Sequence, residues 1–254
     1  MISEVAFGMP APVEPSNVIR VAVLGACLLL FWAVYGGIGV MQAEGAELYT
    51  LHTPVDDWFP LSPIWVLAYL WLFPQVLSPL AIFSSTRVMK RALIAFVVMV
   101  AAGIPFWLFY PVTVPREPVP VEDLWTFGLA LTRMIDPPTN CFPSMHVAEA
   151  AFAALVMRRH DKLVGNVLIG CTFAIWYSTV ALDQHWVVDG AMGLAMALIA
   201  NALAFRGIPP EHFEGRPRAW HATWLGLYVV LFLIAASGWW TGWAMPYLDQ
   251  PMWR

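Results

Sequence analysis

Long apolar stretches separated by polar segments dominate the chain. A helix needs about 20 apolar residues, at 1.5 Å per residue, to cross the hydrocarbon core of a bilayer. Seven stretches are candidates, and the fourth is noticeably short: residues 18–40, 63–83, 92–112, 145–157, 163–182, 186–205 and 223–243. This pattern predicts an all-α, polytopic membrane helix bundle with six core spans and a seventh span near the C-terminus.

Composition supports a membrane protein and excludes several other classes. Of the 254 residues, 60% are hydrophobic and 12% are charged, and the mean hydropathy is +0.67. A soluble domain has about a quarter charged residues. The net charge of −4 provides no basic surface for nucleic acid, and three cysteines are too few for a disulfide scaffold. The lipid bilayer is therefore the predicted partner, whereas the oligomeric state stays open.

The positive charges predict an orientation. Ten of the 13 lysines and arginines fall on one side of the predicted bundle: Arg20, Arg87, Lys90, Arg91, Arg158, Arg159, Lys162, Arg206, Arg216 and Arg218. The other side receives Arg116, Arg133 and Arg254. Because cytoplasmic loops carry an excess of basic residues, the N-terminus is predicted to be cytoplasmic and the C-terminus to lie outside.

The chain divides into a flexible N-terminal tail (1–17), one transmembrane catalytic domain (18–243) and a C-terminal tail (244–254). The first span is expected to be an anchor, since no basic region precedes it as in a signal peptide. Two long polar segments lie on the outer side. Residues 113–144 are rich in proline and are expected to hold an interfacial helix around 122–135. The acidic segment 41–62 is expected to cover the mouth of a site and to bind a polyol or amine head group.

Two clusters of polar residues stand at the outer ends of spans. One runs from Asn140 to His146 and opens the short fourth span, and the other runs from Asp183 to Asp189 and opens the sixth. Ionisable residues at membrane depth are costly and indicate function by default. One helix leads inward and the next returns, so both clusters are predicted to lie on the same face.

The first cluster has features of an anion site. Pro143 suits the first turn of a helix, where its missing N–H is harmless, and Ser144 can cap the helix. The free amides and the positive end of the helix dipole would then face outward. Because the apolar part of this span covers only about 20 Å, the helix is expected to start in a recess below the outer surface.

The second cluster places an imidazole beside a carboxylate. His185 and Asp189 are spaced i, i+4, so they share a helix face. A carboxylate on one imidazole nitrogen fixes the tautomer and makes the other nitrogen a better nucleophile or ligand. Arg116 is one of the few outer cations, and its guanidinium group suits phosphate.

These motifs resemble those of a known family. NCFPSMH (140–146) and STVALDQHWVVDGAMG (178–193) are similar to two signature motifs of the type 2 phosphatidic acid phosphatase superfamily. They are most similar to its inositol phosphorylceramide synthase and sphingomyelin synthase branch. The resemblance implies that His185 attacks phosphorus and forms a phosphohistidine, that Asp189 orients it, and that His146 protonates the leaving group. It also implies that Ser144 and Asn140 belong to the phosphate site.

The resemblance further implies a metal-independent lipid phosphatase or phosphotransferase without a cofactor. The expected substrate is a membrane lipid, and the expected location is a bacterial plasma membrane with an extracytoplasmic active site. The chain departs from the wider family where Thr179 replaces an arginine, where Trp186 replaces a tyrosine, and in lacking any outer lysine. Fewer cations favour a monoanionic phosphodiester, with Arg116 as the main phosphate ligand.

Other readings are open at this stage. His146 and His185 could be the axial ligands of haem in a membrane cytochrome, or the polar residues could belong to a transporter or scaffold. Cys141 could be a nucleophile, although a structural role is ordinary for such a cysteine. Glu149 lies one turn after His146 and could orient it, line a cavity or join helices by hydrogen bonding. The lipid substrate, the acceptor and the choice between hydrolysis and transfer stay undetermined.

Overall fold

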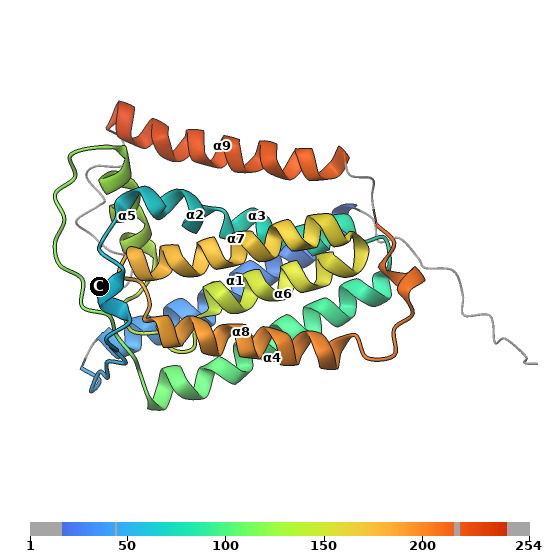
Figure 1. Ribbon diagram of the computed structural model, residues 1–254, viewed down its shortest axis with the longest axis horizontal. Helices are drawn as coiled ribbons and strands as arrows, with labels where there is room; N and C mark the ends of the chain where they lie inside the picture. Colours follow the sequence, from blue (N-terminus) through green and yellow to red (C-terminus); the bar gives the residue numbers. More distant parts are fainter. Residues whose placement is uncertain (1–16, 44, 216–218, 243–254) are drawn as a thin grey trace, which may run out of the picture.

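The computed structural model describes residues 17–43, 45–215 and 219–242, and this part is helical with no strand (Figure 1). The helices are α1 (Asn17–Ala43), α2 (Val66–Leu70), α3 (Leu72–Ile82), α4 (Thr86–Phe109), α5 (Leu124–Ile135), α6 (Met145–His160), α7 (Lys162–Ala181), α8 (Val187–Ala204) and α9 (Ala219–Thr241). Three short 3-10 turns are η1 (Asp56–Trp58), η2 (Pro63–Trp65) and η3 (Pro210–Phe213). The predicted terminal tails lie outside the described residues, except that Asn17 begins α1.

Four of the predicted spans are helices that are long and apolar enough to cross a membrane: Gly25–Gln42, Thr86–Phe109, Lys162–Ala181 and Val187–Ala204. Within the described ranges, Pro63–Pro79, Leu124–Ile135 and Tyr228–Thr241 are shorter apolar helical stretches. The all-helical class is therefore confirmed, whereas the count of six or seven spans stays a prediction.

The second predicted span is not one continuous helix. Residues 63–82 form η2, α2 and α3, with a break at Trp71. Pro74 has no N–H, and its ring would clash with the carbonyl of Leu70 if one helix continued, which explains why α2 ends there. Tyr69, near the end of α2, contacts His146 of α6, and this contact is important for the site.

α6 occupies the centre of the bundle and packs against α7, α8 and α3 (Figure 1). Almost every residue from Met145 to Met157 is buried, and alanines make up much of this helix. Small residues let helix backbones approach closely. α8 approaches α6 closely at Gly193, where a Cβ atom would lie 2.3 Å from the carbonyl oxygen of Ser144. This contact brings the starts of α6 and α8 together.

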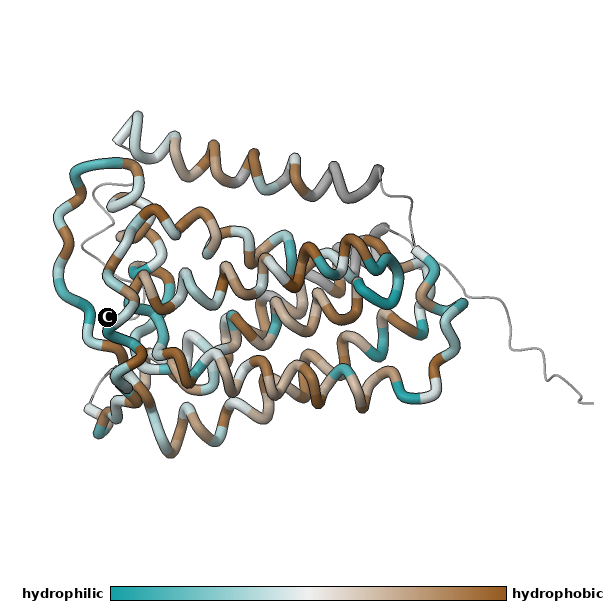
Figure 2. The backbone as a smooth tube through the Cα atoms, viewed as in Figure 1, coloured by the Kyte–Doolittle hydropathy of each residue, from teal (hydrophilic) through white to brown (hydrophobic). Residues whose placement is uncertain are grey.

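Polar and charged residues gather at the two ends of the bundle, and hydrophobic residues extend along the helices (Figure 2). Segments 45–62 and 111–144 lie at one end, where α5 also packs (Figure 1). The opposite end carries the turns before α4, between α6 and α7, and after α8. Its described basic residues are Arg87, Lys90, Arg91, Arg158, Arg159, Lys162 and Arg206. The structure therefore separates the described members of the two groups of basic residues as the sequence pattern predicted.

The start of α6 differs in one detail from the prediction. Ser144 is the N-cap, and its Oγ accepts a hydrogen bond of 3.5 Å from the N–H of Val147. Pro143 precedes the cap and follows a cis peptide bond, so its predicted place in the first turn is wrong. The backbone N–H of Ser144 donates a hydrogen bond of 3.0 Å to the carbonyl oxygen of Asp189 in α8. This bond ties the start of α6 directly to α8.

Candidate active site

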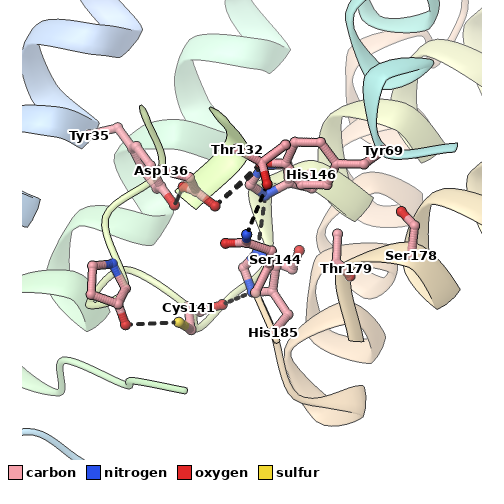
Figure 3. Close-up of polar contacts among 12 residues, drawn as sticks. Tyr35, Tyr69, Thr132, Asp136, Cys141, Ser144, His146, Ser178, Thr179 and His185 are labelled. Atoms are coloured by element: carbon pink, nitrogen blue, oxygen red, sulfur yellow. Dashed lines mark hydrogen bonds and ion pairs between the residues drawn. The ribbon is translucent and has the colours of Figure 1, made fainter. Parts of the chain in front are cut away.

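Two histidine side chains meet at the starts of α6 and α8. His146 is the second residue of α6, and His185 lies two residues before α8. The Nδ1 atom of His146 is 3.0 Å from the Nε2 atom of His185, which is hydrogen-bonding distance (Figure 3). The side chain of His185 is 1% exposed and that of His146 is 12% exposed. The structure therefore brings the two predicted histidines together in a buried pocket.

Hydrogen bonds define the protonation pattern of this pair. The Nδ1 atom of His185 is 2.7 Å from the carbonyl oxygen of Cys141 and 3.4 Å from the Oδ2 atom of Asp189. A carbonyl oxygen can only accept, so Nδ1 of neutral His185 carries the proton. Its Nε2 atom then holds a lone pair that accepts the N–H of His146. The arrangement leaves His185 with the tautomer that a nucleophilic Nε2 atom requires.

Asp189 is held rigidly between His185 and the start of α8. Its side chain is fully buried, and its Oδ2 atom accepts the backbone N–H of Trp186 at 2.8 Å. An acidic side chain is favourable in the first turn of a helix because it faces the positive end of the dipole. The position is therefore suited to stabilise positive charge on the His185 ring.

A second group of residues surrounds the far side of His146. The hydroxyl of Tyr69 is 2.7 Å from the Nε2 atom of His146 and 3.3 Å from the Oδ2 atom of Asp136. Asp136 also accepts a hydrogen bond of 2.9 Å from the hydroxyl of Tyr35, and its Oδ2 atom is 3.9 Å from the Nε2 atom of His146. When His146 is neutral, Tyr69 donates to it. When His146 is protonated, Tyr69 can accept from it and donate to Asp136, so this group can stabilise both states.

The loop that carries His185 is fixed by backbone bonds. The carbonyl oxygen of Thr179 accepts the N–H groups of Gln184 and His185 at 2.8 and 3.1 Å. Asp183 takes a left-handed conformation with φ of 53°, and its carboxylate forms an ion pair of 3.0 Å with Arg133. Burial raises the pKa of Asp183, and the neighbouring arginines oppose this shift. These contacts hold the ring of His185 in place.

Arg116 lies beside the histidine pair, but it also braces the loops. Its guanidinium group donates to the carbonyl oxygens of Asp183 and Asp136, at 3.2 and 2.7 Å, and to the side-chain oxygen of Gln184. The side chain is 9% exposed. Three of its five N–H groups are thus used within the protein, and at most two are left for a phosphate.

The other two predicted phosphate ligands, Asn140 and Ser144, belong to the motif 140–146 and are buried. The amide nitrogen of Asn140 donates to the carbonyl oxygen of Tyr35 at 2.6 Å, which joins the loop before α6 to α1. The side-chain oxygen of Asn140 has no hydrogen-bond partner among the described residues. Ser144 is completely buried as the cap of α6. Both side chains support the position of His146, and a phosphate contact by either one stays a prediction.

Cys141 contributes its backbone rather than its thiol. The carbonyl oxygen accepts from His185, while the Sγ atom lies 3.2 Å from the carbonyl oxygen of Pro138. Burial raises the pKa of the Cys141 thiol well above its ordinary value. A nucleophilic cysteine needs a stabilised thiolate, so this environment favours the structural reading of Cys141.

The acidic outer segment folds onto the start of α8. Asp56 accepts a hydrogen bond of 2.7 Å from the N–H of Val187, and its other carboxylate oxygen accepts from the backbone and side chain of Thr53. The imidazole of His52 packs against the ring of Trp186. Segment 45–62 therefore covers one side of the site, and Asp56 caps α8. The predicted binding of a polyol or amine by this segment stays a prediction.

The predictions based on sequence do not include the contacts of Tyr69 and Asp136 with His146, or the contact of Asp56 with the start of α8. Tyr69 lies in an apolar stretch, where one tyrosine is unremarkable, and Asp136 lies in the long proline-rich segment 113–144. A polar residue inside a predicted span is the one signal that could have drawn attention to Tyr69.

Among the described residues, no group of three or more histidine, cysteine, aspartate or glutamate side chains could hold a metal ion.

A cavity of about 120 Å³ opens next to His146. Its polar wall includes Tyr35, Tyr69, Asp136 and Glu149, and the other walls are mostly apolar side chains of α1 and α3: Phe31, Trp32, Leu72, Phe73, Val76 and Leu77. The pocket therefore joins a polar centre to an apolar space between helices, which is typical of a site for an amphiphile.

The fold and site define a helical membrane protein with a buried histidine pair backed by carboxylates. A family model of the PAP2 superfamily matches residues 50–203, more than half of the chain, and the chain therefore belongs to the PAP2 superfamily. None of the curated proteins and none of the solved structures matches the chain significantly. Since this superfamily generally comprises phosphatases and phosphotransferases, membership indicates a phosphatase-type, lipid-related function.

Proposed function

We propose that this protein cleaves the phosphate ester of a membrane lipid through a covalent phosphohistidine on His185. The observation that carries the proposal is the contact of 3.0 Å between His146 and His185, together with the hydrogen bond from His185 Nδ1 to Cys141. One imidazole is oriented as a nucleophile, and the other is within reach of the same reacting group.

In the first step, the lone pair on Nε2 of His185 attacks phosphorus, and the bond between phosphorus and the leaving oxygen breaks. His146, protonated on both nitrogens, gives its Nδ1 proton to that oxygen. Asp189 stabilises the positive charge that develops on His185. Tyr69 and Asp136 stabilise His146 before it gives up the proton.

In the second step, His146 is neutral and takes a proton from water or from a lipid hydroxyl. The resulting oxygen nucleophile attacks phosphorus, and the bond between phosphorus and Nε2 of His185 breaks. If water is the attacking group, the protein is a phosphatase. If a lipid hydroxyl is the attacking group, the protein is a phosphotransferase. The two histidines supply nucleophile, acid and base, so the proposed reaction requires no metal ion.

Substrate binding must separate the histidine pair. A nucleophile and phosphorus approach to about 3–3.5 Å before reaction, and the acid must reach the leaving oxygen. The two nitrogens therefore need roughly 6 Å between them, compared with 3.0 Å here. His146 borders the cavity of about 120 Å³, so a rotation of its side chain toward that space would make room for the phosphate.

A lipid phosphodiester fits this site better than a small phosphate monoester. The cavity beside His146 is mainly apolar, as the hydrocarbon part of a lipid requires. Arg116 and Arg133 supply the nearby positive charge, and both are already bound to protein oxygens. A single negative charge therefore matches the site, as in head-group transfer between lipids of the inositol phosphorylceramide synthase type. The basic residues at the opposite end support an extracytoplasmic site.

The experiment is covalent trapping of a phosphorylated protein. We expect purified wild-type protein, in buffer with EDTA, to acquire acid-labile label from a lipid carrying ³²P, and His185→Ala to acquire none. His146→Ala should release product at least a hundredfold more slowly, since general acid–base catalysis contributes about 10²–10⁴-fold.

Glu211→Ala is a suitable control, because Glu211 is exposed in η3 at the opposite end of the bundle and should leave turnover unchanged. Label on the His185→Ala protein would contradict the proposed nucleophile. Loss of wild-type labelling in EDTA, with recovery on adding a divalent metal, would contradict the metal-independent mechanism.

A further inference from the structure

Glu149 is a buried carboxyl group that the proposed reaction does not use. It lies on α6, one turn after His146, and is 9% exposed. Its Oε1 atom has no hydrogen-bond partner among the described residues. A buried polar atom without a partner is destabilising, so nearly all such atoms in proteins are paired. The missing partner points to a ligand.

Two cavities meet at Glu149. The cavity next to His146 has a volume of about 120 Å³, and a second one of about 80 Å³ lies between α1, α3, α4 and α6. Both are lined by Phe31, Val76, Leu77 and Glu149. The second cavity is otherwise lined by apolar side chains and Cys27. An apolar path therefore leads from the histidine pair past Glu149 into the bundle.

The alternative explanation is that Glu149 joins helices by hydrogen bonding. Gln75 shows what such a role looks like here, because its amide donates to the carbonyl oxygens of Ala150 and Leu168 and to the hydroxyl of Thr172. Glu149 has no comparable contact within the described part of the chain. Glu149 instead lines both cavities, so a molecule bound in them would lie next to its side chain.

We propose that this path binds the hydrocarbon chain of the lipid, and that Glu149 accepts a hydrogen bond from a hydroxyl or amide N–H group near the phosphate end. This inference rests on the proposed function. His146 and Glu149 are three residues apart on α6, which corresponds to a rise of about 4.5 Å. A group a few bonds from the phosphate ester can span that distance. Glu149 then selects lipids that carry a hydrogen-bond donor at this place over lipids that carry only ester groups.

Two phosphodiester lipids with the same head group provide the test. Sphingomyelin has a hydroxyl and an amide N–H close to its phosphate, whereas phosphatidylcholine has ester carbonyls there. We expect wild-type protein in detergent to bind sphingomyelin about tenfold more tightly than phosphatidylcholine in native mass spectrometry. Glu149→Leu should lose this preference, and Glu149→Gln should keep most of it because the amide oxygen can still accept.

Leu77→Ala is the matched control, since it enlarges both cavities without removing a polar group. This substitution should weaken the binding of both lipids equally and leave the ratio of their affinities unchanged. An unchanged ratio in folded Glu149→Leu protein, or an equal loss in Glu149→Gln, would overturn the inference. Product formation is measured in the same samples. Absence of turnover with either lipid would count against the proposed function, whereas the binding ratio tests Glu149 separately.

Discussion

At the scale of single residues, the contacts of Arg116 indicate a positioning role in addition to the predicted role as a phosphate ligand. The sequence indicated a phosphate ligand, but the guanidinium group also joins the backbone before α6 to the loop that carries His185. A planar group with several donors can bridge these oxygens at once, whereas a lysine ammonium cannot reproduce that geometry. Arg116 therefore positions the two histidines relative to each other, in addition to any direct contact with phosphate.

We accordingly expect Arg116→Lys to lower stability as well as activity. Losing two buried hydrogen bonds from a charged donor should cost about 3 kcal/mol of unfolding free energy. Thermal unfolding in detergent and steady-state kinetics would measure both effects. Arg91→Lys is the control, because Arg91 is exposed at the opposite end and should change stability by less than about 0.5 kcal/mol. A rise in KM with unchanged stability would instead indicate that Arg116 serves only as a phosphate ligand.

At the scale of elements, the distance between α6 and α8 determines the site. Gly193 permits the helices to approach until its α-carbon lies against the backbone of Ser144, where a side chain has no room. The N–H of Ser144 bonds to the carbonyl of Asp189 in the same region. Any separation of these helices therefore displaces both the cap of α6 and the carboxylate beside His185.

Gly193→Ala tests this dependence. The added methyl group would lie 2.3 Å from a backbone oxygen that cannot rotate away, so the helices must separate. We expect a loss of about 1–3 kcal/mol in stability and about a hundredfold in kcat. Gly170→Ala in α7 is the control, because a Cβ atom there meets nothing within 4 Å. Wild-type activity of Gly193→Ala would mean that the site tolerates movement of α8.

The sequence predicts helices better than it predicts their ends or the contacts between them. Apolar runs locate α4, α7 and α8 because the bilayer demands continuous hydrophobic length. α4 nevertheless begins at Thr86, six residues before its apolar stretch, since Ser85 caps it and basic residues continue the helix. The motifs identify both histidines. Tyr69 escapes prediction because its contact with His146 joins residues 77 positions apart, a tertiary effect that periodicity does not encode.

At the scale of the whole molecule, the uneven charge of the two ends makes the orientation testable. Segment 45–62 lies with the site at one end, and η3 lies at the other (Figure 1). Asp57 and Glu211 are exposed at these two places. In a background with Cys27 and Cys171 replaced by alanine, we expect an impermeant maleimide to label Asp57→Cys in intact cells, and Glu211→Cys only after lysis. The reverse pattern would place the site in the cytoplasm.

The family match begins at residue 50, so α1 lies outside the part that the PAP2 superfamily defines. Yet α1 supplies Phe31 and Trp32 to the wall of the cavity and Tyr35 to the carboxylate of Asp136. The wall of the cavity is therefore shared between α1, which lies outside the match, and α3 and α6, which lie inside it. Exchanging α1 for a helix with smaller or larger side chains offers a means of altering which lipid tails are accepted while the reacting histidines stay intact.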